Sequence, residues 1–294
     1  MTYRLQLERW GRNGPSLVLV HGLGASGRYW RWVAEFLQDE FRVFAPDLLG
    51  FGRSPWPDIA YTVNDHLDAL DATLKAEGIE DEPPVLAGHS LGTILALAWA
   101  ARYPKRFGGL VLMGLPCYRS PEEARAHVAG LGPLAHATVA RPRLGAAICG
   151  LMCFGRPFWR RVVPALMPDV PADVARDGVL HTWGSYSRTL QHGILDVDVR
   201  TLAGQVGATG LPTQLLHGDL DREAPLEGAS GLARSIGWSL EVLKGAGHGL
   251  PIERPQACAE AIRGQTAGSI REVGYTTGHV KLPRPTQRPI GEVK

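Results

Sequence analysis

The stretch PVLAGHSLGTILAL, residues 84–97, begins as a short apolar run, breaks at Gly88 and resumes as a helical run rich in alanine and leucine. In this order of strand, tight turn and helix, a Gly-x-Ser-x-Gly match predicts an exposed nucleophile. Gly88 and Gly92 would keep neighbouring backbone segments from colliding at such a turn. Ser90 is expected at its tip, with the N–H groups of a helix starting at Leu91 pointing at its hydroxyl. Alone, the match also fits a glycine-bounded loop with an ordinary serine.

The size and composition of the chain indicate a large α/β core. Of its 294 residues 45% are hydrophobic, enough for one large domain or a domain with an insertion. The 31 basic and 29 acidic residues nearly balance, which argues against a nucleic-acid partner and against binding to a membrane surface. The N-terminus lacks the apolar segment of a signal peptide, and the longest apolar run, Ile94–Ala101, is far shorter than the ~20 residues of a membrane span. We therefore expect a cytoplasmic protein of unspecified oligomeric state.

Apolar runs and amphipathic segments alternate on both sides of this stretch. Strands are expected at 3–10, 17–20, 41–46, 110–113, 213–216 and 240–243, and helices at 29–37, 63–74, 226–236 and 253–262. Thr62 and Asp65 predict a capping box at the start of the second of these helices. The alternation predicts an α/β fold, with a mostly parallel twisted sheet and helices on both faces. Such sheets bind ligands at the carboxyl ends of their strands, where the glycine-rich loops of this chain fall.

The pattern changes between residues 116 and 210. Glycines and prolines interrupt short helical segments there, no clear strand is seen, and aromatic residues are frequent. We expect a helical cap inserted at 116–210 between the two parts of one core, 1–115 and 211–264. Residues 265–294 contain three prolines, mixed charges and no apolar periodicity, which predicts a disordered tail.

A serine nucleophile needs a base, because a free hydroxyl is a weak nucleophile near neutral pH. His248 is the preferred candidate, since flanking glycines let its loop carry the imidazole over a cleft. The base in turn needs a carboxylate that fixes its tautomer. Asp221 is favoured for this role, with Asp219 expected to cap the same loop and His217 expected to pack at the end of a strand. The order Ser90, Asp221, His248 is the one expected of a triad on this type of sheet.

The oxyanion formed by attack on a carbonyl needs two backbone donors. One is expected to be the N–H of Leu91, and the other the N–H of Leu23 in the glycine-rich loop that follows strand 17–20. His21 and His89 could be further bases, but tightly packed loops usually need a hydrogen-bonded polar side chain at such positions. We therefore interpret both histidines as structural.

No cofactor or metal is expected. Cys149 and Cys153 are four residues apart, so they could share one face of a helix. The four cysteines show no Cys-x-x-Cys spacing and no clustered histidine, which favours buried thiols over metal ligands.

Several motifs occur together here that are also found together in a known superfamily: His21-Gly22-Leu23-Gly24, the loop 47–54, Gly88–Gly92, Gly218-x-x-Asp221 followed by Pro225, and Gly247-His248 followed by Glu253-Arg254-Pro255. On these motifs, residues 3–264 resemble the α/β-hydrolase superfamily in its capped form with a serine nucleophile. The resemblance independently favours Asp221 as the acid and implies that 116–210 roofs the site. It offers no counterpart for 265–294. The pair Leu115-Pro116 leaves no acid after strand 110–113, which excludes the different triad layout of some relatives.

The serine in the Gly88–Gly92 turn favours reactions at acyl groups over displacement at alkyl carbon. Members of the superfamily that displace halide or open epoxides carry aspartate at that position. The leading hypothesis is a hydrolase for a carboxylic ester or related acyl bond of a small molecule, with an apolar portion that the cap aromatics would contact. Hydrolysis of C–C bonds in meta-cleavage products is the second hypothesis, which a pocket-facing Arg160 or Arg161 would favour. Cofactor-free perhydrolase activity and a ligand receptor on the same fold are also compatible with these residues, because one fold hosts many functions.

Overall fold

The computed structural model describes residues 3–79, 82–168 and 170–270, which contain a seven-stranded sheet of order β1-β3-β2-β4-β5-β6-β7. Neighbouring strands are parallel except for the β1–β3 pair, which is antiparallel. The predicted mostly parallel sheet is therefore confirmed. The strands are β1 (Leu7–Trp10), β2 (Ser16–Val20), β3 (Arg42–Pro46), β4 (Val85–His89), β5 (Gly109–Met113), β6 (Thr213–Gly218) and β7 (Ser239–Leu243).

The first predicted strand is shorter than expected. Residues 3–6 lie outside β1 because side chains take their backbone hydrogen bonds. The N–H of Leu5 donates to Thr73 Oγ1, and the N–H of Gln6 donates to Ser54 Oγ, each over 2.9 Å. An alternating pattern cannot reveal such side-chain acceptors, so it predicts too long a strand.

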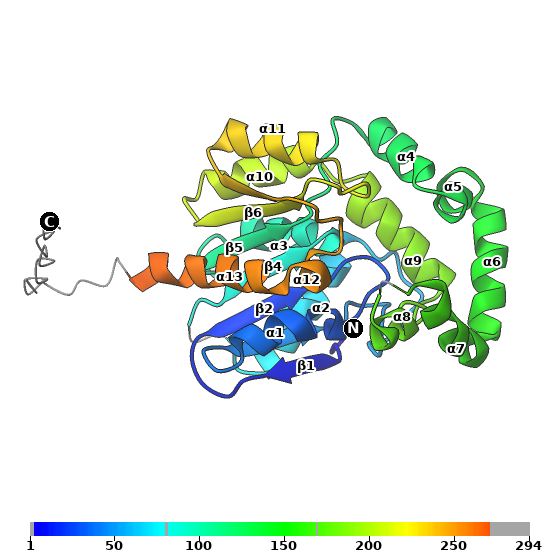
Figure 1. Cartoon of the computed structure of the whole chain (residues 1–294), viewed down its shortest axis with the longest axis horizontal. Coiled ribbons are helices and arrows are strands. Elements are labelled where there is room, and N and C mark those ends of the chain that lie inside the picture. The colour runs from blue at the N-terminus through cyan, green and yellow to red at the C-terminus, as the bar shows by residue number, and fades with distance from the viewer. Residues whose placement is uncertain (1–2, 80–81, 169, 271–294) are drawn as a thin grey trace, which may run out of the picture.

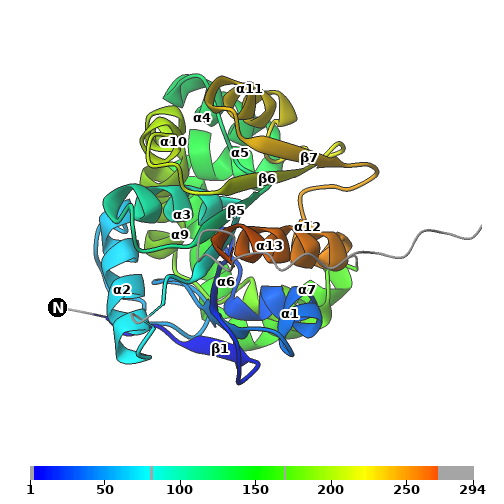
Figure 2. The ribbon, with the colours of Figure 1, turned by 90° about the vertical axis from the view of Figure 1, so that its left-hand side faces the viewer.

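Helices cover both faces of the sheet (Figures 1 and 2). On one face, alternate strand residues such as Leu17 and Leu19 pack with α1 (Arg31–Leu37) and α13 (Pro255–Ile270). On the other face, Val18 and Val20 belong to the larger cluster that includes α2 (Val63–Ala76) and α3 (Leu91–Arg102). Because β2, β4 and β5 are buried throughout, their apolar runs have no polar alternation.

Helix boundaries follow capping chemistry. The predicted capping box is present: the Thr62 hydroxyl accepts from the Asp65 N–H over 3.2 Å, and the Asp65 carboxylate accepts from the Thr62 N–H over 2.8 Å. The helix predicted at 29–37 starts with a 3₁₀ turn, η1 (Gly27–Trp30). The one predicted at 253–262 is divided into α12 (Leu250–Glu253) and α13, because Pro255 starts a new helix.

The predicted insertion is helical. It contains α4 (Pro121–Gly130), α5 (Pro133–Ala140), α6 (Pro142–Phe154), α7 (Arg156–Leu166), α8 (Ala172–Asp177), α9 (Trp183–Leu190) and a π-helical turn, η2 (Gln191–Leu195), which lie along one end of the sheet (Figure 1). α10 (Val199–Gly207) instead packs on α3 and on α11 (Leu226–Ile236) of the core. We therefore propose that the cap ends before Val199 rather than at residue 210.

The predicted tail overlaps the last helix. α13 continues to Ile270, and the Gln265 side chain is buried against the β5 residue Gly109, so the disorder expected for 265–294 stays a prediction. The remainder, 271–294, lies outside the described residues. None of the described helices is long and apolar enough to cross a lipid bilayer.

Candidate active site

Ser90 lies on a sharp turn between β4 and α3. Its backbone angles, φ 54° and ψ −122°, are rarely adopted by residues with a side chain. A Cβ atom at Gly88 would overlap the backbone of Gly92, and a Cβ atom at Gly92 would overlap the Val20 carbonyl. Both glycines are therefore required by close backbone approach, and together they allow β4 to reverse directly into α3.

Asp221 and His248 come together from the loops that follow β6 and β7. His248 Nδ1 donates to Asp221 Oδ2 over 2.8 Å, and the Asp221 side chain is completely buried. The other carboxylate oxygen, Oδ1, accepts the N–H groups of Glu223 and Ala224, each over 2.9 Å. These two backbone bonds orient the carboxylate, so the pairing leaves Nε2 as the free nitrogen of the neutral imidazole.

His248 is positioned beside the serine turn by His89. The ring nitrogen Nε2 of His89 donates to the His248 carbonyl over 2.7 Å, and the two ring centroids lie 4.8 Å apart. In the described part of the chain, no hydrogen bond joins the Ser90 hydroxyl to the His248 ring. His248 Nε2 instead has Glu223 Oε2 at 3.7 Å. Catalytic hydrogen bonds of this kind are often completed only when a substrate is bound.

The charges around His248 oppose the effect of its burial. Burial lowers the pKa of His248, but the Asp221 hydrogen bond and the negative charges of Glu223 and Asp221 raise it, and the net pKa lies above the ordinary 6.5. For Asp221, burial raises the pKa, but the hydrogen bond and positive charge of His248 outweigh it and lower the pKa overall. The pair therefore favours an ionised carboxylate beside an imidazole that can be protonated.

Three other histidines near the site, His21, His89 and His217, form hydrogen bonds to the backbone. His21 donates from Nδ1 to the Gly22 carbonyl over 2.7 Å and accepts the Leu48 N–H at Nε2 over 2.8 Å. Burial lowers the pKa of His89 to about 3, which keeps this ring neutral. His217 donates from Nε2 to the Ala224 carbonyl over 2.9 Å.

The loop that carries Asp221 makes two further polar contacts. His217 Nε2 also lies 3.4 Å from Asp221 Oδ2, so it adds a second polar neighbour to the carboxylate. The described hydrogen bonds do not include the predicted cap of Asp219 within its own loop; its Oδ1 instead accepts the Gly245 N–H over 2.7 Å, which ties the acid loop to the loop that carries His248.

The N–H groups of the two expected oxyanion donors stand at neighbouring turns. Leu23 lies in the loop after β2, and Leu91 is the first residue of α3, whose N–H has no intrahelical partner. Among the hydrogen bonds of the described residues, neither N–H has an acceptor in the protein. A Cβ atom at Gly22 would be 3.1 Å from Ser90 Cβ, so the first loop runs directly against the serine turn.

A family model described as the alpha/beta hydrolase family matches residues 17–261, which is most of this chain. The chain belongs to the alpha/beta hydrolase family. As a member of that family it is an enzyme, and the sequence-based assignment of fold and superfamily is confirmed.

Three similar proteins illustrate this hydrolase's relatives. Lipase LipV of Mycobacterium tuberculosis is 35% identical over 63% of this chain and 77% of its own length. Probable lysophospholipase BODYGUARD 4 of Arabidopsis thaliana is 27% identical over 79% of this chain and 59% of its own length. A thermophilic esterase structure from Thermogutta terrifontis has a TM-score of 0.65 and 27% identity, and the match covers 91% of this chain and 94% of that one.

The cap of this alpha/beta hydrolase contacts the loops of the site through η2 and α4, among other elements. In η2, Gly193 packs against the Leu91 side chain, where a Cβ atom would come within 2.8 Å of Leu91 Cδ1. In α4, His127 Nε2 lies 3.1 Å from the Arg222 carbonyl and 3.2 Å from the Glu223 carbonyl, so it can donate to either. The cap thus contacts both the serine turn and the acid loop.

Two residues near the hydrolase site were not predicted to act there. Glu223 could have been suspected, because it follows Asp221 by two residues in the same loop. The bond from His89 to the His248 carbonyl joins residues 159 positions apart, and only the folded arrangement reveals it.

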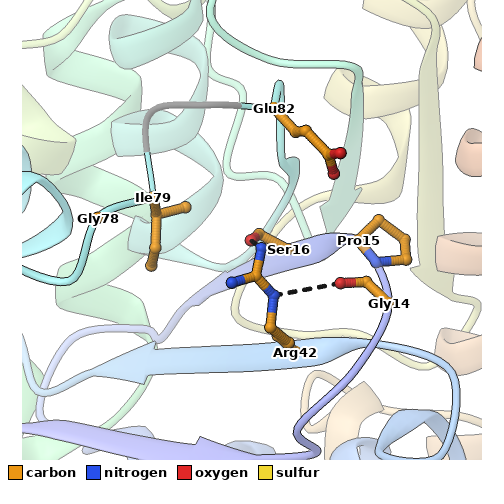
Figure 3. A pocket seen from close by; sticks show the side chains of 7 residues that line it. All are labelled: Gly14, Pro15, Ser16, Arg42, Gly78, Ile79 and Glu82. Carbon is orange, nitrogen blue, oxygen red and sulfur yellow. Dashed lines mark hydrogen bonds between the residues drawn. The ribbon is translucent and has the colours of Figure 1, made fainter.

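A separate depression of about 570 Å³ lies where β2 and β3 begin (Figure 3). Ser90 instead follows the carboxyl end of β4. The serine hydroxyl of the depression, Ser16 Oγ, accepts from Arg42 Nη2 over 3.0 Å, and no histidine lines the space. This depression therefore offers no pair of serine and histidine like the one proposed at Ser90. Its lining residues are Gly14, Pro15, Ser16, Arg42, Gly78, Ile79 and Glu82.

Two of the cysteines lie on one helix. Cys149 and Cys153 share one face of α6, with their sulfur atoms 3.8 Å apart. Within the described ranges, no group of three or more histidine, cysteine or acidic side chains is placed to hold a metal ion.

Proposed function

We propose that this enzyme hydrolyses carboxylic esters or related acyl bonds through an acyl-enzyme on Ser90. The observation that carries the proposal is the buried Asp221–His248 hydrogen bond of 2.8 Å beside the strained turn of Ser90. In this assignment Ser90 is the nucleophile, His248 the general base and acid, and Asp221 the group that holds the imidazole.

The reaction proceeds in two halves. Ser90 Oγ attacks the carbonyl carbon while His248 Nε2 takes the hydroxyl proton, and the carbonyl oxygen becomes an oxyanion. Collapse of this intermediate breaks the bond to the alcohol, which leaves with the proton from Nε2. Water then attacks the acyl-serine and gives a proton to the same nitrogen, and the second collapse returns that proton to Ser90 and releases the acid.

The N–H groups of Leu23 and Leu91 are proposed to donate to the oxyanion in both halves. Both lack protein acceptors in the described hydrogen bonds, so no internal bond must break before they act. Losing one donor of this type typically costs about 3 to 4 kcal/mol of transition-state stabilisation. The positive end of α3 adds to the same effect.

The proposed substrate is a small molecule whose acyl or alcohol portion is apolar. The cap supports this through the half-buried aromatic residues of α9, of which Tyr186 contacts the donor loop: a Cβ atom at Gly24 would be 3.5 Å from its ring. The names of the relatives, lipase and probable lysophospholipase, describe enzymes of ester bonds in molecules with long apolar chains.

C–C bond hydrolysis finds less support in the cap. A cationic cap residue against the substrate would favour that reaction, and Arg160 and Arg161 are the candidates. Both are exposed on α7, and no described contact links either one to Ser90, Asp221 or His248. Perhydrolase chemistry would use the same three residues, and a receptor would not need their reactivity.

Covalent labelling tests the proposal. A fluorophosphonate should label wild-type protein at Ser90 and should not label Ser90→Ala, while p-nitrophenyl esters should be hydrolysed only by the former. A panel of esters, lactones and dienoates then ranks the bond types. Folded wild-type protein that resists the label would favour a receptor, and unchanged ester turnover by Ser90→Ala would refute the assignment.

A further inference from the structure

The outer side of the cap exposes an unusual amount of apolar surface. Ten large hydrophobic side chains are prominently exposed in the described part of the chain, and seven of them lie between residues 131 and 167. Phe154 is 91% exposed, Leu151 and Leu166 are 66% exposed, and Phe158 is 59% exposed. Contiguous exposed apolar side chains usually mark an interaction surface. α6 and α7, which carry most of them, form the edge of the molecule farthest from the sheet (Figure 1).

The same segment has a strongly one-sided charge. Residues 125–168 contain six arginines and no aspartate, glutamate or lysine. Two of the six are engaged: Arg125 pairs with Asp196, and Arg156 donates to backbone carbonyls. The other four are exposed and make no ion pair with any described residue: Arg141, Arg143, Arg160 and Arg161.

These features share one surface, which we call the outer cap face. In α6, Leu144, Leu151 and Phe154 recur at helical spacing, and Phe158 and Arg161 recur in the same way in α7. The face is defined by Arg143, Leu144, Leu151, Phe154, Phe158 and Arg161, and the exposed Arg160 precedes Arg161 in α7. Apolar side chains flanked by arginines, with no acids, are typical of helices that lie in a lipid–water interface.

Charge decides which occupant fits this face. A second copy of the chain, docked symmetrically, would bring unpaired arginines against unpaired arginines. Five of the seven exposed apolar side chains are leucine or methionine, which offer no flat ring for stacking on nucleic-acid bases. A surface that is anionic outside and hydrocarbon beneath satisfies both the arginines and the leucines.

We propose that the outer cap face binds the surface of lipid bilayers that contain anionic lipids. The leucine and phenylalanine side chains would enter the boundary between headgroups and acyl chains, and the arginines would contact the phosphate layer. The near-zero net charge of the whole chain conceals this local excess, so overall composition argues against a membrane surface while the cap argues for one. The proposal concerns binding alone and does not depend on the reaction at Ser90.

Co-sedimentation with vesicles tests this inference on the full chain. Wild-type protein should bind vesicles of equimolar phosphatidylcholine and phosphatidylglycerol more tightly than phosphatidylcholine alone. Since each arginine near an anionic surface is worth about fivefold in affinity, the double variant Arg160→Glu, Arg161→Glu should bind at least about tenfold more weakly. The double variant Phe154→Ser, Phe158→Ser should lose binding to both kinds of vesicle.

Matched controls come from the core, where Phe36 is 43% exposed on α1 and Arg234 is exposed on α11. Phe36→Ser and Arg234→Glu should leave vesicle binding within about twofold of wild type, and unchanged circular dichroism of every variant shows that the fold is kept. Failure of wild-type protein to bind anionic vesicles would overturn the proposal. So would equal binding by the cap variants, or a cap-dependent dimer seen by light scattering without vesicle binding.

Discussion

Leucine plays opposite parts in the core and in the cap. Leu95, in α3, is completely buried between the sheet and its covering helices, whereas Leu151, in α6, is 66% exposed. Three neighbouring strands of the core are buried at every position, while the cap consists of short helices separated by glycine and proline. The comparison teaches that apolar content alone does not define a core, because in the cap much of it faces outward.

The core, not the cap, carries the residues proposed to react. The five residues proposed for the reaction lie in turns and loops after core strands or in the first turn of α3. They are Ser90, Asp221, His248, Leu23 and Leu91. The cap touches these loops through Gly193, His127 and Tyr186 but supplies none of the groups proposed to react. Changes in the core should therefore alter rate and stability, and changes in the outer cap should leave both nearly intact.

The largest expected effect is that of Ser90→Ala, which removes the nucleophile. We expect kcat for a p-nitrophenyl ester to fall by about a million-fold, as in serine hydrolases that lose this group. Ser235→Ala is the matched control, since its hydroxyl only donates to the Leu232 carbonyl on α11. A kcat of Ser90→Ala within tenfold of wild type would contradict the proposal that the core residue Ser90 is the nucleophile.

Asp221→Asn should have the next largest effect, about 10⁴-fold on kcat, because the imidazole would be held in the wrong tautomer. The control Asp219→Asn changes a neighbouring carboxylate that bonds only the Gly245 N–H and so should keep most of the rate. Single-turnover rates of both variants separate chemistry from binding. Equal losses in the two variants would mean that loop geometry, not the Asp221–His248 bond, is what matters.

A pair of leucine substitutions tests the comparison by stability. Leu95→Ala should lower the free energy of unfolding by about 2 to 5 kcal/mol, because it leaves a cavity in a close-packed interior. Leu151→Ala should change that free energy by less than about 0.5 kcal/mol, because the side chain already lies in water. Urea denaturation measures both. A large loss for Leu151→Ala would show that the outer side of the cap is packed against something.

The smallest effect expected is a shift in pH dependence. Glu223→Gln removes a negative charge 3.7 Å from His248 Nε2 and therefore lowers the pKa of the imidazole. Because the neutral imidazole acts as the base, kcat/KM should rise with pH at a lower pH than in wild-type enzyme, whose pKa lies above 6.5. Glu227→Gln, an exposed carboxylate on α11, is the control and should leave the profile in place.

Much of the core could be predicted from the sequence because its signals are local. The fully buried strands appear as unbroken apolar runs, the capping box of α2 needs only Thr62 and Asp65, and α11 begins and ends at the residues expected. The loops that carry Asp221 and His248 could be found because glycines mark the turns that lead to them. Each of these features depends on neighbours in the chain.

The features that could not be predicted depend on contacts between distant segments. The donation from His89 to the His248 carbonyl, the placement of α10 against α3, and the approach of Glu223 to His248 all arise only after folding. The sequence could not predict that the cap leucines are exposed, for a related reason. An amphipathic pattern shows that one helix face differs from the other, but not which of them meets the protein.

Ser90 illustrates how function constrains the fold at a single position. Its backbone angles, φ 54° and ψ −122°, carry a conformational cost of roughly 1 to 3 kcal/mol for a residue with a side chain. Glycine would relieve that strain, and in the proposed mechanism it would also remove the nucleophile. Selection of variants for thermal stability alone would therefore favour the loss of the Ser90 side chain. Selection of a more thermostable enzyme therefore has to include turnover as a second criterion.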